Sequence, residues 1–392
     1  MMKVQLAKPD ITQREIDAVV EVMKSGILSI GPKITEFEKK VANYAKVKYA
    51  VAVNSGTSAL HLIIKAMGIG MGDEVITSSF SFVASTNCFM MEGAKPVFVD
   101  IDLNTLNMNI NLIESKITAK TKAILVVDVF GQPMDMMRLR EIADKYNLYL
   151  IEDSCEAIGS AYDGDVAGSL ADAAVFAFYP NKQITTGEGG IIVTNNENIA
   201  LIAESLRSQG RAITGFWLHH ERLGYNYRMS ELQAALGCVQ MDRLDEIIKN
   251  RQEVAEMYNK ELSSIYGITI PYIDPKVTTM SWFVYVIQVH ESIDREKMMI
   301  YLKDNGVGCR PYFTPIHVQP YMVEEFGYEE EDYPITADIG RRSIALPFHT
   351  SITLDEVKYV ATVIQEGISI SQKNQEDFVA TTSIEELNKI FL

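Results

Sequence analysis

The clearest indication of the fold is the sequence AILVVDVFGQPMDMMRLREIADKYNLYLIED at residues 123–153. It opens with an apolar run at 123–129, continues with a helical pattern over about 135–146, and closes with a second apolar run at 148–153. Continuous apolar strands that alternate with helices are typical of a parallel sheet covered by helices on both faces. The stretch therefore predicts one strand–helix–strand unit of a doubly wound α/β domain.

The same alternation extends to both sides of this unit. Further apolar runs lie at 49–53, 74–78, 96–100, 173–178 and 190–194, separated by helical patterns. A long periodic helical stretch at 229–258 follows, and beyond it the apolar runs at 281–289 and 343–348 are fewer, which indicates antiparallel strands. We expect an N-terminal arm and a large α/β domain over 1–245, and a smaller α+β domain with a polar tail over 246–392.

The N-terminal arm carries its own helix signal. Thr12 and Glu15 stand at the spacing of a capping box, and apolar residues follow at helical period. The pattern predicts a helix that begins after Thr12 and ends near Gly26.

Composition excludes several classes of protein. The 392 residues include 36 Lys and Arg against 52 Asp and Glu, a net charge of −16, which disfavours nucleic acids and anionic membrane surfaces as partners. No stretch approaches the ~18 apolar residues of a membrane helix, and the first residues lack a signal-peptide pattern. Four scattered cysteines argue against both a disulfide framework and a metal site. We therefore expect a cytoplasmic protein without a metal.

A strand also leads into a turn and a helix at AVAVNSGTSALHLIIKA, residues 50–66. Here Ser55, Gly56, Thr57 and Ser58 present backbone N–H groups and hydroxyls at the start of a helix. Such a terminus is an anion site of phosphate size, because its free N–H groups and the helix dipole both attract negative charge. Plain helix capping by Ser55 or Thr57 explains the same residues equally well.

Two acids end the apolar run at 148–153. Strand alternation directs Glu152 and Asp153 to opposite sides, so one of them can point into a site at the carboxyl edge of the sheet. A buried carboxylate there is costly unless it meets a cation or several donors. The alternative is that these acids cap the following helix.

The most specific stretch is AAVFAFYPNKQITTGEGGIIVT, residues 173–194. An apolar strand delivers Asn181 and Lys182 into a turn rich in glycine and threonine, and a second strand leaves the turn. Burial lowers the pKa of a lysine and makes its amine a Schiff-base nucleophile. Taken alone, a lysine that extends from a loop to solvent would be the simpler interpretation.

These features together suit one cofactor. A phosphate cup, an acid for a pyridinium nitrogen and an amine for an aldehyde are what pyridoxal phosphate requires. Phe82, in SFSFVAST, supplies an aromatic ring that can stack on the cofactor. Metal and nucleophilic-serine chemistry lack their motifs, since the sequence has no HExxH and no GxSxG, and a Walker A loop is also absent. The glycines at 68, 70 and 72 follow a helical pattern and precede a strand, whereas a nicotinamide-dinucleotide fingerprint needs a strand, then glycines, then a helix.

The motifs also resemble a known family. NSGTSAL, SFVAST, EDSCEAIGS, FYPNKQITTGEGG, LGYNYRMSELQAALG and RPYFTPIHVQP occur in this order in the DegT/DnrJ/EryC1/StrS aminotransferases, and the resemblance extends from about Lys8 to Val363. These are pyridoxal-phosphate enzymes that act on nucleotide-linked keto sugars. The resemblance implies the type I fold of aspartate aminotransferase, with a large and a smaller domain, and a pyridoxamine phosphate form in the reaction cycle.

The resemblance implies roles for the residues around the cofactor ring. Lys182 would form the internal aldimine and later move a proton between the cofactor and the substrate carbon. Asp153 would keep the pyridine nitrogen protonated. Phe82 would stack on the ring, and Glu156 falls where family members often carry Gln or His beside it.

The resemblance also implies how the phosphate is bound. Gly56, Thr57 and Ser58 would bind it within one subunit, and Asn226 would reach it from the other, so a homodimer with shared active sites is expected. Many members have a serine where this chain has Ala177. If nothing replaces that hydroxyl, its loss should weaken cofactor binding by about 1 kcal/mol.

Substrate residues are expected among polar groups near the site. Arg228, Arg310, Tyr312 and His317 are candidates for the nucleotide pyrophosphate or for the carboxylate of an L-glutamate donor. An ion pair or an interface hydrogen bond explains each of the four equally well.

A finer resemblance points to the GDP-perosamine synthases of this family, on Asp128 and Glu156 and on the segments around Lys182 and Trp282. It implies amination of C4 of GDP-4-keto-6-deoxymannose, in polysaccharide biosynthesis. One alternative is a C3- or C4-aminotransferase that uses a dTDP- or UDP-linked keto sugar. Another is a regulatory protein without catalysis, against which the intact Lys182 and Asp153 count.

Overall fold

The computed structural model of the protein describes residues 2–212 and 218–372. A seven-stranded sheet in the order β1-β9-β8-β5-β4-β2-β3 forms its centre. The strands are β1 (Tyr49–Val53), β2 (Glu74–Ser78), β3 (Lys95–Val99), β4 (Thr121–Val127), β5 (Tyr149–Asp153), β8 (Ala173–Ala177) and β9 (Gly190–Thr194). The predicted, mostly parallel sheet is confirmed, and β9 is the exception, antiparallel to both of its neighbours. Segment 178–189 joins β8 to β9 without a crossover helix, and neighbouring strands joined in this way run in opposite directions.

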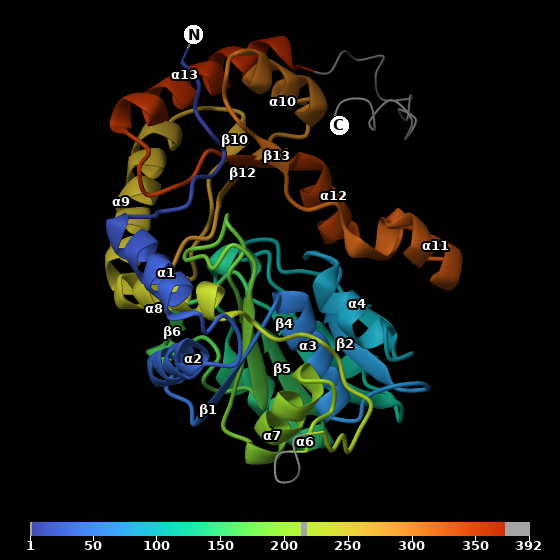
Figure 1. Ribbon diagram of the computed structural model, residues 1–392. Helices are drawn as coiled ribbons and strands as arrows, with labels where there is room; N and C mark the ends of the chain where they lie inside the picture. Colours follow the sequence, from blue (N-terminus) through green and yellow to red (C-terminus); the bar gives the residue numbers. More distant parts are fainter. Residues whose placement is uncertain (1, 213–217, 373–392) are drawn as a thin grey trace.

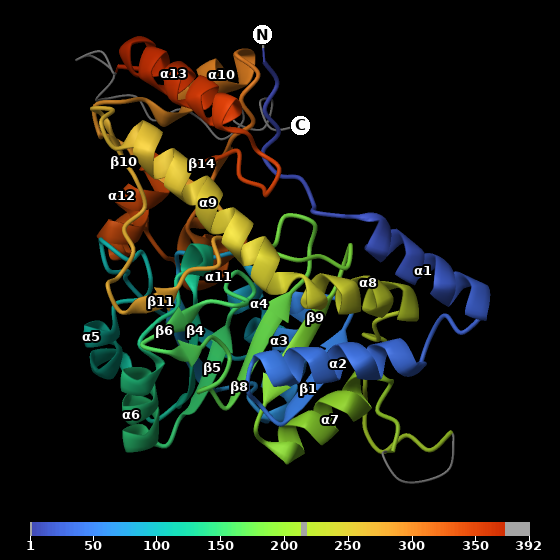
Figure 2. The ribbon, with the colours of Figure 1, turned by 90° about the vertical axis from the view of Figure 1, so that its left-hand side faces the viewer.

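Helices cover both faces of this sheet (Figures 1 and 2). One face packs against α2 (Pro32–Tyr44), α6 (Met136–Tyr146) and α8 (Glu231–Asp242), and the other against α3 (Gly56–Ala66), α4 (Ala84–Met90) and α7 (Glu197–Arg207). Along β4, Ile124 and Val126 enter the first core, whereas Ala123 and Leu125 enter the second. Because both faces are covered, the strand is apolar at successive positions, as the run at 123–129 predicts.

A second, antiparallel sheet lies above the first in Figure 1. Its strands are β10 (Ile268–Thr269), β12 (Tyr285–Val289), β14 (Ser343–Leu346) and β13 (Arg310–Pro311), in that order, packed against α10 (Arg295–Asp304) and α13 (Leu354–Ile370). A small third sheet joins β11 (Val277–Thr279), β6 (Ala161–Tyr162) and β7 (Asp165–Val166). The predicted smaller α+β part with antiparallel strands is therefore present. Its exact boundary at 245/246 stays a prediction.

Further helices and 3-10 turns lie around these sheets. They are α1 (Gln13–Ser25), α5 (Ile110–Ile113), α11 (Pro320–Phe326), α12 (Pro334–Arg342) and the 3-10 turns at Glu114–Lys116, Val129–Gly131, Ile316–Val318 and Glu330–Asp332. The capping box of Thr12 and the end of α1 at Gly26 are as predicted. The polar tail predicted for the end of the chain falls on residues 373–392, outside the described residues.

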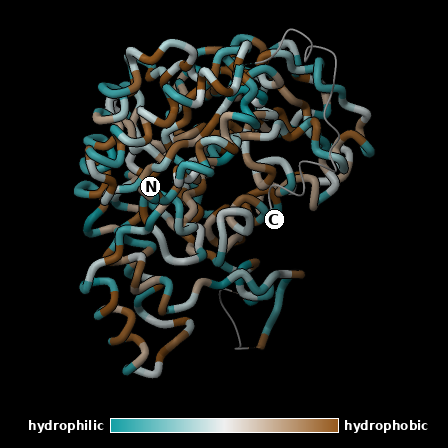
Figure 3. Tube along the Cα trace, turned by 90° about the horizontal axis from the view of Figure 1, so that it is seen from above, coloured by the Kyte–Doolittle hydropathy of each residue, from teal (hydrophilic) through white to brown (hydrophobic). Residues whose placement is uncertain are grey.

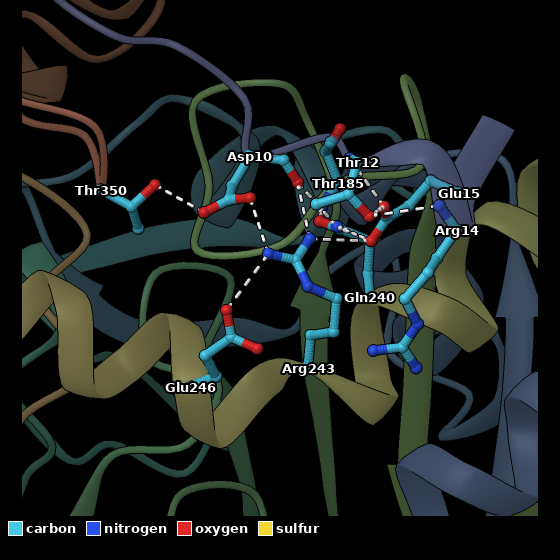
Figure 4. Close-up of polar contacts among 9 residues, drawn as sticks. All are labelled: Asp10, Thr12, Arg14, Glu15, Thr185, Gln240, Arg243, Glu246 and Thr350. Atoms are coloured by element: carbon cyan, nitrogen blue, oxygen red, sulfur yellow. Dashed lines mark hydrogen bonds and ion pairs between the residues drawn. The ribbon is translucent and has the colours of Figure 1, made fainter.

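The helical stretch predicted at 229–258 is divided in two at Arg243, between α8 and α9 (Leu244–Leu262). A buried polar network holds this junction (Figure 4). Arg243 Nη2 lies 2.8 Å from Asp10 Oδ1, and its Nη1 lies 2.9 Å from Glu15 Oε1. Thr350 Oγ1 donates to Asp10 Oδ2 at 2.7 Å, and Gln240 Nε2 donates to Glu15 Oε1 at 2.9 Å. The network thus joins the N-terminal arm to the helix junction and to the smaller domain.

The buried Glu15 of this network should make the stability of the fold depend on pH in the acid range. Burial raises the pKa of Glu15, but hydrogen bonds from Thr12, Arg243 and Gln240 outweigh burial and lower it from 4.5 to about 2. The resulting stabilisation, up to about 3 kcal/mol, is therefore present above pH ~4.5 and is lost as the pH falls towards 2. We expect the free energy of unfolding in urea to fall more steeply between pH 5 and pH 3 for the wild type than for Glu15→Gln. Parallel pH curves for the two proteins would contradict this assignment.

In the part of the chain that the structure describes, no helix has the length and apolar character needed to cross a membrane. Figure 3 shows the reason, because apolar stretches along the trace are short and are interrupted by hydrophilic ones.

Candidate active site

A cavity of about 530 Å³ opens at the carboxyl ends of β4, β5 and β8. Its lining includes Val127, Asp153 and Ala177 from these three strand ends, and segment 311–313 and Phe283 from the smaller domain. Of the eight residues predicted to bind the cofactor, six line this cavity: Gly56, Thr57, Phe82, Asp153, Glu156 and Lys182. Strands and loops far apart in the sequence therefore bring the predicted set together, at the sheet edge where doubly wound folds bind ligands.

The start of α3 forms one end of the cavity. Ser55 caps the helix, since its Oγ accepts a hydrogen bond from Ser58 N at 3.1 Å, and the hydroxyls of Ser55 and Ser58 lie 2.9 Å apart. Gly56 and Thr57 line the cavity, whereas Ser58 does not. Both interpretations of this motif therefore hold: Ser55 caps the helix, and Ser55, Gly56 and Thr57 all line the space for an anion.

Gly190 lies against the backbone at the start of α3, next to Ser55 and Gly56. A Cβ at position 190 would lie 2.3 Å from Ser55 O and 2.6 Å from Gly56 N, closer than real Cβ atoms approach backbone. Only glycine lets the first residue of β9 pass so close to the start of α3.

Gly190→Ala is therefore expected to displace the cup and to lower the affinity for pyridoxal phosphate at least about tenfold, or ~1.4 kcal/mol. The matched control is Gly187→Ala, three residues earlier in the segment that leads into β9, which adds backbone strain at a φ of +80° but places no Cβ within 4 Å of another group. Titration of each apoprotein with pyridoxal phosphate gives the two dissociation constants. Equal affinities for the two variants would show that the contact with Ser55 is unimportant.

The two acids at the end of β5 diverge, as strand alternation predicts. Asp153 lines the cavity and is 6% exposed, while Glu152 points to the other face and accepts a hydrogen bond from Gly168 N at 2.9 Å. Burial raises the pKa of Asp153 above its usual value, and hydrogen bonds from Cys155 and the positive charge of Lys182 offset only part of this rise. A carboxylate in such a place is suited to a cationic ring nitrogen, because a positive charge would offset its burial.

Lys182 enters the cavity from the turn between β8 and β9. Its Nζ lies 3.3 Å from Glu156 Oε1 and 3.9 Å from the centre of the Phe283 ring. Glu156 is held in turn by Phe130 N, which donates to its Oε2 at 2.9 Å from a residue with a φ of +59°. Burial raises the pKa of Glu156 above its usual value, and the nearby charge of Lys182 offsets only part of this rise. The amine is therefore placed between a carboxyl group and an aromatic face.

Hydrogen bonds fix the turn that carries Lys182. Thr185 Oγ1 donates to Phe178 O at 3.0 Å, and Thr185 N donates to Gln240 Oε1 at 3.2 Å. Gln240 belongs to the network of Figure 4, which also contains Arg243. The lysine is thus supported by the same contacts that hold the N-terminal arm and the helix junction.

The residues present fit pyridoxal phosphate. The cup of Gly56 and Thr57 leaves room for an anion, and a Cβ at position 56 would meet Ala177 Cβ at 2.9 Å. Asp153 and Lys182 line the same space. Asn181 Oδ1 is buried there and has no hydrogen-bond partner among the described residues, so it can accept one from a ligand.

Several predicted residues lie outside this cavity. Asn226 is exposed, and Arg228 lines a separate cavity of about 380 Å³ that also includes Arg207. Arg310 is exposed on β13. His317 is fully buried with its Nδ1 2.9 Å from Ser79 Oγ, and burial lowers its pKa.

Tyr312 is the one substrate candidate that lines the cavity, where its hydroxyl lies 3.5 Å from Asn181 Nδ2. Phe283 and Phe313 line it too, although the sequence did not indicate them. In the sequence these two phenylalanines look like ordinary core residues. They line the cavity because the smaller domain packs against the large one.

Comparison with known proteins agrees with this geometry. Residues 9–365 match the DegT/DnrJ/EryC1/StrS aminotransferase family. The chain is 38% identical over 371 residues to the spore coat polysaccharide biosynthesis protein SpsC of Bacillus subtilis (91% of this chain, 95% of SpsC). It is 37% identical over 371 residues to a GDP-perosamine synthase of Escherichia coli O157:H7 (94% and 100%). It superposes with a TM-score of 0.89 on the PLP form of the sugar aminotransferase Spr1654 of Streptococcus pneumoniae, at 28% identity (94% and 99%). The chain thus belongs to the DegT/DnrJ/EryC1/StrS aminotransferase family and, as predicted, is a pyridoxal-phosphate-dependent enzyme of the type I fold.

Proposed function

We propose that this enzyme transfers the amino group of L-glutamate to a nucleotide-linked 4-keto-6-deoxy sugar, with GDP-4-keto-6-deoxymannose as the foremost candidate and GDP-perosamine as its product. The convergence of Lys182, Asp153 and Glu156 in one cavity supports amino transfer. The similarity over nearly the whole chain to a GDP-perosamine synthase supports the choice of sugar.

In this proposal the chain's own residues hold the cofactor and move protons. Gly56 and Thr57 bind the phosphate, Asp153 holds a proton on the pyridine nitrogen, and Phe82 stacks on the ring. The bound cofactor supplies an aldehyde and an electron-accepting ring. Lys182 takes the α-proton from glutamate at its Nζ and later delivers a proton to the sugar carbon from the same side. Glu156, 3.3 Å away, orients that amine between the two steps.

We further propose that two subunits share each site in a homodimer. Within the described residues Lys182 is the only cationic side chain that lines the cavity, yet a phosphate, a donor carboxylate and a pyrophosphate all require positive charge. Asn226 and Arg228 do not line the cavity of their own chain, which leaves them free to complete the partner's. Four exposed apolar side chains near α1 offer surface for such a contact: Met23, Ile27, Leu28 and Ile30.

A cytoplasmic location is part of the same proposal. All four cysteines are free in the structure, and three of them are buried, as expected for a reducing compartment.

The test of the substrate is direct. The loaded enzyme is incubated with L-glutamate and, separately, with GDP-, dTDP- and UDP-linked 4-keto-6-deoxy sugars, and mass spectrometry detects the amino sugar and 2-oxoglutarate. We expect amination of the GDP-linked sugar. Amination of only a dTDP- or UDP-linked sugar would overturn the choice of nucleotide. No amino transfer to any of them would overturn the function.

A further inference from the structure

The segment Tyr225–Arg228 lies along the large domain like a short strand. Tyr225 N donates to Leu206 O at 2.7 Å, Tyr227 N donates to Arg207 O at 3.0 Å, and Asn54 N donates to Tyr227 O at 2.8 Å. Its side chains alternate. Tyr225 and Tyr227 turn towards α3, where their rings stack 4.9 Å apart at 11°, whereas Asn226 is exposed. Because the side chains alternate, the packing of Tyr225 and Tyr227 against α3 directs the side chain of Asn226 to the surface.

Glu92 holds the two tyrosines through a polar cluster. His61 Nε2 lies 2.8 Å from Glu92 Oε1, Tyr225 OH donates to the same oxygen at 3.1 Å, and Lys65 Nζ lies 2.6 Å from Glu92 Oε2. His61 Nδ1 lies 3.3 Å from Tyr227 OH. We call these five residues (His61, Lys65, Glu92, Tyr225 and Tyr227) the Glu92 cluster.

Both carboxylate oxygens of Glu92 have partners in this cluster. Burial raises the pKa of Glu92, but hydrogen bonds from Lys65 and His61 outweigh it and lower the pKa, so the carboxylate is ionised at neutral pH. An ionised carboxylate only accepts, so His61 donates to Glu92 from Nε2. His61 is 5% exposed. A buried cluster of charged and polar side chains adds little net stability compared with apolar residues of the same size. Its hydrogen bonds do hold the side chains in one defined arrangement.

The Glu92 cluster also connects two sites. His61 and Lys65 lie on α3, the helix whose first residue, Gly56, lines the cofactor cavity. The Tyr225–Arg228 segment rests on the same helix and carries Asn226 away from that cavity. One helix therefore supports both the phosphate cup of its own chain and the segment that, in the proposed dimer, completes the cup of the partner.

We propose that the Glu92 cluster positions Asn226 and Arg228 for the partner subunit's cofactor site, so that its members are positioning residues acting across the interface. This inference rests on the shared active site of the proposed function. The competing interpretation is that the cluster merely attaches the segment to α3 and supports the cup of its own chain. The two interpretations differ in which subunit's cofactor site loses affinity when the Glu92 cluster is disrupted.

Hybrid dimers separate the two cases. Glu92→Ala subunits are coexpressed with Lys182→Ala subunits under different affinity tags, and mixed dimers are isolated. In a mixed dimer the site that retains Lys182 receives Asn226 and Arg228 from a subunit whose Glu92 cluster is intact. The measured quantity is the dissociation constant of pyridoxal phosphate. It is obtained by titration from the visible absorption band that depends on Lys182, so only the site that retains Lys182 is observed.

We expect the Glu92→Ala homodimer to bind pyridoxal phosphate at least about tenfold more weakly than the wild type, and the mixed dimer to recover to within about twofold. A mixed dimer as weak as the Glu92→Ala homodimer would overturn the inference, because the defect would then lie in the chain that carries the substitution. Unchanged affinity in the homodimer would overturn it as well.

Two further variants keep the test interpretable. Tyr225→Phe removes a single hydroxyl from the Glu92 cluster, and it replaces Glu92→Ala if that protein does not fold, as judged by circular dichroism and size-exclusion chromatography. Asn226→Ala mixed with Lys182→Ala is the benchmark. If the affinity of this benchmark mixed dimer does not recover either, the proposal of a shared site is wrong. If the benchmark recovers and the Glu92→Ala mixed dimer does not, only the proposed role of the Glu92 cluster is wrong.

Discussion

Lys182→Ala is expected to lower kcat for amino transfer at least about 10³-fold and to abolish the visible band of the bound cofactor. Within the described part of the chain, no other amine lines the cavity. Glu156, 3.3 Å from the amine, cannot take its place, because a carboxyl group does not condense with an aldehyde. Steady-state rates and absorption spectra with and without glutamate measure the two effects.

The matched control is Lys276→Ala, which removes a lysine from a different cavity and should leave both the rate and the band unchanged. A Lys182→Ala protein that retained more than about a tenth of the wild-type rate would show that another group moves the proton.

Asp153→Asn is expected to lower kcat by about 10²- to 10³-fold while the fold is kept. The amide has nearly the same shape as the carboxylate, but it lacks the negative charge that holds a proton on the pyridine nitrogen. Without that proton the ring withdraws electrons poorly, so the loss should fall on the rate of the glutamate half-reaction. Stopped-flow absorption at saturating glutamate measures this rate.

Glu152→Gln is the control for this experiment, because it changes the neighbouring acid on the opposite face of β5, away from the cavity. Equal losses of rate in Asp153→Asn and Glu152→Gln would indicate a general effect on the sheet rather than a role at the cofactor. Any loss of stability in either variant is measured separately by thermal unfolding.

Much of the site follows from strand ends. Asp153 closes one apolar run and Lys182 follows another, and parallel strands place their carboxyl ends at one edge, so their convergence was predictable before any coordinates. Gly56 and Thr57 were predictable in the same way, because they follow a strand and begin a helix.

What the sequence could not predict depends on pairing between distant segments. Phe283 reaches Lys182 because the smaller domain packs over the sheet edge, and nothing in its local pattern indicates that contact. At the division of the long helix, Arg243 contacts partners more than 200 residues away, the half-buried Asp10 and the buried Glu15. Ser58 matches the family motif, but its hydroxyl lies against Ser55 rather than in the cavity.

The most direct test of the site is to locate the cofactor on the chain. The enzyme is loaded with pyridoxal phosphate, reduced with borohydride to make the link to lysine permanent, digested, and mapped by mass spectrometry. We predict that the phosphopyridoxyl group is found on the peptide that contains Lys182 and that it is absent from Lys182→Ala. A label on another lysine, or none on the wild-type protein, would contradict the assignment of this cavity as the active site.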